Sequence, residues 1–131
     1  MIKYDEYNVT VLEQVKERIS ESEKLKGTIR KKDIYLVDIP EESVDNDILV
    51  KLSYVELTAG NHSSNTSKSD VIGIQVDIWK AQPMFPIGEG NAVRDVMKDL
   101  GFYQVGSFDG YGQKELGKMR DSRRYVRSFK K

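Results

Sequence analysis

Few side chains in this sequence have the types and spacing that enzyme chemistry requires. The stretch GEGNAV (88–93) precedes a helical pattern as a phosphate-binding loop does, but Val93 stands where the third glycine belongs. Asp77 and Lys80 follow the acid-then-lysine order of metal-dependent nucleases, yet residues three apart on a strand face opposite ways. His62, the only histidine, has no neighbour in the sequence to orient it as a general base. We therefore expect no catalytic, metal or cofactor site, and no enzyme activity.

The strongest charge feature is a basic C-terminal segment, residues 114–131. It holds eight Lys and Arg residues against two acidic ones, although the whole chain has a formal net charge of 0. Cations interleaved with Tyr125 and Phe129 are typical of nucleic-acid grooves. The sequence pI of about 6.6 is far from the basic value such modules show. A nucleic-acid-binding accessory protein is thus kept as the alternative function.

A second charged segment, residues 38–47, is acidic and contains no Lys or Arg. Opposite charges on one chain can steer a partner, or a second copy of the chain. They can equally be two solvated surfaces that never meet. The acidic candidates for an interface are Asp38, Glu41, Glu42, Asp45 and Asp47, and the basic ones are Arg120, Arg123, Arg124 and Arg127.

The only tryptophan stands on the polar side of an alternating pattern, VIGIQVDIWKAQ (71–82). Isoleucines and a valine occupy one face of the strand this pattern predicts, and Trp79 shares the other face with Gln75 and Asp77. A large aromatic side chain in that position is covered either by the chain itself or by another protein. Both readings stay open, and Trp79 is a candidate interface residue.

Alternating and helical spacing together predict an α+β fold, with a mostly antiparallel sheet of four to five strands packed against two helices. We expect Asn91 to cap the second helix and Gly27 and Gly101 to stop the two helices. The basic last strand should be an exposed edge. The expected helices span 9–26 and 91–101, and the expected strands span 33–39, 47–57, 71–82, 102–108 and 123–131.

Residues 1–131 are expected to form a single domain. There is no cysteine, no apolar run of the ~20 residues a membrane span needs, and no apolar stretch near the N-terminus that suggests a signal peptide. Residues 58–70 lack any large aliphatic side chain and predict a flexible loop. We expect a protein made in a cytosol, with no membrane partner.

Several stretches together resemble a known family. A charged N-terminal helix precedes YLVDIP, a long polar connector leads into VIGIQVDIW, and a Pro/Gly linker is followed by AVRDVMKDLGF and RRYVRSF. This arrangement resembles the tail terminator proteins of long-tailed phages, also described as tail completion or head–tail joining proteins, of the minor tail protein U type. The likeness covers most of the chain, and VDIW and KDLGF are its most telling pieces.

The resemblance implies a structural, non-enzymatic virion protein made in the bacterial host cytoplasm. Such proteins are α+β domains that cap the tail tube as a ring, expected to be hexameric, and present a surface to the head connector. The implied partners are further copies of the chain, the tube protein and connector proteins, with DNA only as passing cargo. On this reading the loop 58–70 docks on the tube through Asn61, His62, Asn65 and Lys68.

A head-to-tail ring needs two different, complementary patches on each subunit. We expect the basic residues Arg123, Arg124 and Arg127 to approach the acidic segment of the adjacent subunit, at Asp38, Glu41 or Glu42. A ring lumen lined by one of these charge sets is equally compatible with the sequence.

Overall fold

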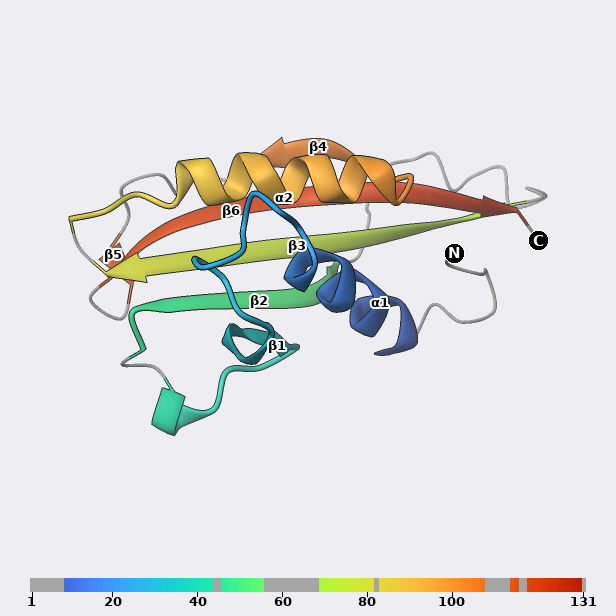
Figure 1. Cartoon of the computed structure of the whole chain (residues 1–131). Helices are drawn as coiled ribbons and strands as arrows, with labels where there is room; N and C mark the ends of the chain where they lie inside the picture. The colour runs from blue at the N-terminus through green and yellow to red at the C-terminus, as the bar shows by residue number, and fades with distance from the viewer. Residues whose placement is uncertain are drawn as a thin grey trace.

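The described part of the chain folds as a mixed β-sheet with two α-helices on one face (Figure 1). The computed structural model describes residues 9–43, 46–55, 69–81, 83–107, 114–115 and 118–130. The predicted α+β class is confirmed. Along the chain the elements are α1 (Val9–Ser20), η2 (Lys31–Asp33), β1 (Ile34–Leu36), η3 (Glu41–Ser43), β2 (Ile48–Val55), β3 (Ser69–Ala81), α2 (Ile87–Asp99), β4 (Tyr103–Ser107), β5 (Lys114–Glu115) and β6 (Lys118–Lys130).

The sheet is built around two long strands, β3 and β6, which pair antiparallel over their whole length. The strand order is β1-β2-β3-β6-β4, and the two-residue β5 pairs with the start of β6. The predicted antiparallel pairing of β2 with β3 is confirmed. Strand β1 runs parallel to β2, whereas the short connection between them predicts an antiparallel pair.

The main core lies between the sheet and the helices, on the face to which Val50, Ile78 and Ile74 contribute. Cross-strand register assigns the alternate residues of β2, β3 and β6 to this face, which we call the helix face. The opposite side is called the open face here, because no α-helix of the described residues lies on it (Figure 1). Strand β2 is apolar on both faces, since Leu49 is fully buried on the open face, as its sequence predicted.

The first helix ends at Ser20, six residues before the predicted end. Val11, Leu12, Val15 and Ile19 are buried at helical spacing, but polar Ser22 and Glu23 stand where the next apolar residues belong. Leu25 and Ile29 instead reach the core from the turns that follow.

The second helix begins at Ile87, four residues before the predicted start, so Asn91 lies inside α2 and does not cap it. Gly101 adopts φ 91° after the end of α2, which confirms the predicted stop, because this left-handed conformation suits glycine.

The basic last strand is not an edge, contrary to prediction. It lies between β3 and β4, and it has buried side chains on both faces, such as Ser122 on the open face and Tyr125 on the helix face. The arginines of β6 can lie inside the sheet because they form hydrogen bonds with polar groups of the same chain.

Candidate interaction surfaces

The predicted basic interface is largely inside the molecule. Arg123 is only 3% exposed and lies on the helix face beneath α2. Its Nε donates to Asp121 Oδ1 at 2.9 Å, and its Nη2 donates to Asp121 Oδ2 at 3.0 Å and to Asn91 Oδ1 at 3.0 Å. The expectation that Arg123 approaches a neighbouring subunit is therefore wrong, because this guanidinium is buried and paired within the chain.

Gly90 explains how α2 comes this close to the buried pair. A Cβ at Gly90 would stand 2.6 Å from Asp121 Oδ2, so a larger residue would fit only if the Asp121 side chain or the helix shifted. Burial raises the pKa of Asp121, and the negative charges of Asp77 and Glu89 raise it further, while Arg123 acts to lower it. Gly90, the second glycine of the GEGN stretch, thus allows α2 to pack closely on the sheet.

Arg120 and Arg124 take part in a polar network on the open face. Asp77 is 1% exposed and accepts both amide hydrogen bonds of Gln75, at 3.1 and 3.0 Å. Arg120 Nη1 lies 3.9 Å from Asp77 Oδ1, and Arg124 Nε donates to Gln75 Oε1 at 3.1 Å. These two arginines therefore help to satisfy a buried carboxylate and amide within one subunit.

Arg127 closes the far end of α2. Its Nη1 donates to the Leu100 carbonyl at 2.6 Å, one of the carbonyls that a helix end leaves without an intrahelical partner. The guanidinium also packs over Gly101. Its main visible role is to hold α2 onto β6.

Trp79 is covered by its own chain, which decides the alternative that its sequence left open. It is 4% exposed on the open face, with Leu49 and Arg120 in register on either side. The Lys51 ammonium stands 5.8 Å from the ring centroid, in reach of a cation–π contact. The prediction that Trp79 is an interface residue is wrong, because too little of its side chain is exposed to contact a partner.

The acidic segment stays on the surface. Asp38, Glu41, Glu42 and Asp47 are exposed, on η3 and the chain on either side of it. Asp45 lies outside the described residues, as do Asn61, His62, Asn65 and Lys68 of the predicted docking loop.

Two exposed apolar patches were missed by the sequence reading. The connector patch consists of Met84 (54% exposed), Phe85 (47%) and Ile87 (40%), between β3 and the first turn of α2. The edge patch consists of Tyr103 (63%) and Val105 (51%) on β4, at the edge of the sheet. The signal for the first is present in PMFPI (83–87), where Met84 and Phe85 lie between two prolines and Ile87 follows, although the pattern by itself predicts only a linker.

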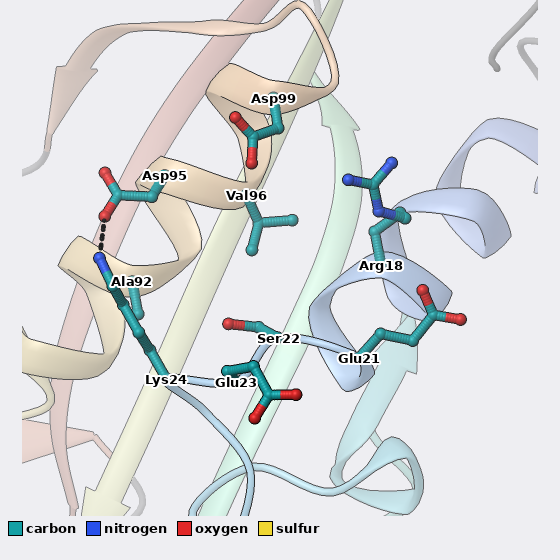
Figure 2. A pocket seen from close by; sticks show the side chains of 9 residues that line it. All are labelled: Arg18, Glu21, Ser22, Glu23, Lys24, Ala92, Asp95, Val96 and Asp99. Carbon is teal, nitrogen blue, oxygen red and sulfur yellow. Dashed lines mark hydrogen bonds and ion pairs between the residues drawn. The ribbon is translucent and has the colours of Figure 1, made fainter.

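The surface of the described residues is also hollowed, at a groove and at a second hollow. The groove between α1 and α2 has a volume of about 410 Å³. Figure 2 shows the turn after α1 on one side and α2 on the other, with Lys24 Nζ reaching Asp95 Oδ2 at 2.9 Å. That contact holds the pKa of Asp95 below its usual value. Because its lining mixes both signs of charge, the groove suits a solvated surface better than a site for one class of ligand.

The second hollow, of about 490 Å³, lies beside the connector patch and is lined by Met84, Asp47 and Lys80 among others. Lys80 is held by Glu89 at 2.5 Å, so Asp47 gives this hollow its negative character. Asp77 and Lys80 face opposite sides of the sheet, as predicted.

Comparisons with known proteins do not assign the chain to a family. No protein-family model matches the chain, and no curated protein matches it. Among the described residues, no helix has the length and apolar character to cross a membrane.

Proposed function

We propose that this chain is a structural protein of a long-tailed phage that caps the tail tube as a ring, of the tail terminator type. In this role it ends tube growth and forms the surface that joins the tail to the head. The resemblance in sequence suggests the role, and the α+β fold with both helices on one face agrees with what that resemblance implies.

The observation that carries the proposal is the contrast between the inside and the outside of the described chain. Arginine and carboxylate groups that could have formed a site are instead used to hold α2 and the strands together, as Arg123 and Asp121 are. The exposed residues that the structure describes include an acidic segment and two apolar patches, features that suit contact with other proteins.

Under this proposal the protein is made in the host cytoplasm and incorporated into the virion tail. Its partners are further copies of itself, the tail tube protein and the head–tail connector proteins. DNA passes through the ring as cargo. The nucleic-acid-binding alternative loses its main support, because Arg123 is buried and Arg120, Arg124 and Arg127 have partners within the fold.

Two measurements test the proposal. Tube protein polymerised with the purified chain should give shorter tubes with one decorated end in electron micrographs, whereas tube protein alone should polymerise without a length limit. Native mass spectrometry of the 15.0 kDa chain should show a ring of about 90 kDa, either alone or on tube ends. Tubes of unchanged length with undecorated ends would refute the proposed role.

A further inference from the structure

The connector patch and the edge patch lie at opposite ends of α2. Ile87 is the first residue of this helix, and Tyr103 follows shortly after its end, so the thirteen-residue helix separates the patches by about 20 Å. Figure 1 shows the connector at one end of α2 and the start of β4 at the other. The chain therefore carries two different apolar surfaces at well-separated places.

This separation distinguishes between two ways of self-association. A two-fold contact in which a patch meets its own counterpart would cover one patch and leave the other exposed, and a reciprocal two-fold contact would cover both patches but stop at a dimer. A head-to-tail contact joins two different surfaces, so it covers both patches at once and repeats around a ring.

The charges beside the two patches are opposite in sign. Asp47 lines the hollow next to Met84, where Lys80 is already neutralised by Glu89. Two cations lie near the edge patch, because β4 pairs with β6. Arg124 is in register with Gly106 of β4, and Arg127 donates to the Leu100 carbonyl, just before β4. Complementary charge at the rim would orient two copies head to tail.

Both patches are held in place before any contact forms. Pro83 and Pro86 restrict the backbone on either side of Met84 and Phe85, and Pro86 is itself buried. Tyr103 stands on a strand that is hydrogen-bonded to β6. Little conformational freedom is lost when such surfaces meet, which favours association.

We propose that the connector patch of one copy packs against the edge patch of the next copy, head to tail. This inference rests on the proposed function for the closure of the contact into a ring, and it replaces the pairing between Arg123 and the acidic segment that the sequence suggested. The acidic side of the contact is Asp47. Its basic side is Arg124 and Arg127, which keep their positive charge because the groups they donate to, the Gln75 amide and the Leu100 carbonyl, are neutral.

The test uses two double variants of the full chain and one control. M84S/F85S removes the connector patch, and Y103S/V105S removes the edge patch. V71S is the control, because Val71 is apolar and 39% exposed but belongs to neither patch. All the substituted side chains are largely exposed, so cooperative urea unfolding, followed by Trp79 fluorescence, should show folded proteins.

Native mass spectrometry over a concentration series should give wild type and V71S as the same oligomer, larger than a dimer, and each double variant as a monomer. An equimolar mixture of the two double variants should form a 1:1 dimer of about 30 kDa and nothing larger. The reason is that each variant keeps the surface that the other has lost, so only one intact contact can form.

Three results would overturn the inference: assembly of either double variant like the wild type, no dimer in the mixture, or a wild type that forms nothing larger than a dimer at any concentration. Each would leave the tube-length assay free to support the proposed function. Conversely, head-to-tail oligomers that fail to limit tube length would retain the inference and reject the terminator role.

Discussion

Replacing Arg123 by methionine tests whether α2 is held by a buried ion pair. Arg123 and Asp121 are 3% and 1% exposed and share two charged hydrogen bonds, at 2.9 and 3.0 Å. R123M keeps much of the side-chain volume but leaves the Asp121 carboxylate buried without its cation. Removal of one partner from such a pair typically costs about 3–5 kcal/mol, a large fraction of the roughly 5–15 kcal/mol by which a domain is stable.

The deficit should depend on pH, with a sign that the pKa of Asp121 fixes. Burial already raises this pKa, and loss of Arg123 removes the interactions that lower it, so the folded-state pKa rises further. A group whose folded pKa is raised contributes stability that is present below its unfolded pKa, near 3.9, and is lost as the pH rises through the folded pKa. R123M should therefore be most destabilised relative to wild type at neutral pH, and should recover about 1.4 kcal/mol per pH unit on acidification through that window.

Urea unfolding followed by Trp79 fluorescence at several pH values measures this difference directly. The matched control is K24M, which removes a cation from the exposed pair with Asp95 and should change the stability little, because solvent screens that pair. The double variant R123M/D121L, which replaces both charges, should recover much of the loss and show no such pH dependence. A deficit for R123M below 1 kcal/mol, or one that is equal at pH 5 and pH 7.5, would refute the reasoning.

Three further outcomes follow from the same structure. G90A should destabilise the fold by about 1–3 kcal/mol, because its Cβ would overlap Asp121 Oδ2, whereas G88A, with open space at that position, should be neutral or slightly stabilising in urea unfolding. W79A should cost about 3–5 kcal/mol and K51M about 1 kcal/mol or less in thermal unfolding; equal losses would contradict the packing described for the ring. Filter binding to single-stranded DNA should show no retention at ~50 mM salt, and tight binding with a steep salt dependence would restore the nucleic-acid alternative.

The local features of this fold could be read from the sequence, whereas its strand order could not. Alternation in residues 71–82 predicts β3 correctly, because the period of two is written into the strand itself. The position of β6 depends on which strand edges meet, and that is decided by contacts between distant residues. Charge suggested an edge, but the arginines of β6 are matched by Asp121, Asp77 and Gln75, which come from β6 itself and from β3.

In the candidate interaction surfaces, too, local features could be predicted from the sequence, whereas contacts between distant residues could not. The acidic residues of segment 38–47 that the structure describes are exposed, as expected for a run of carboxylates without a cation among them. The burial of Arg123 and Trp79 could not be foreseen, because each depends on residues from other elements, Asn91 of α2 and Lys51 of β2. The connector patch was visible in the sequence, and only its exposure needed the structure.

The pairing of β3 with β6 has a consequence for how the chain folds. Ser69 pairs with Lys130 and Ala81 with Lys118, so the two longest strands meet only after a loop of roughly 40 to 60 residues has closed. During synthesis β3 leaves the ribosome well before its partner and can pair at first only with β2. The helix face of the sheet is incomplete until β6, with Arg123 and Tyr125, has been synthesised. We therefore expect folding to be slow, with its final step after β6 has emerged.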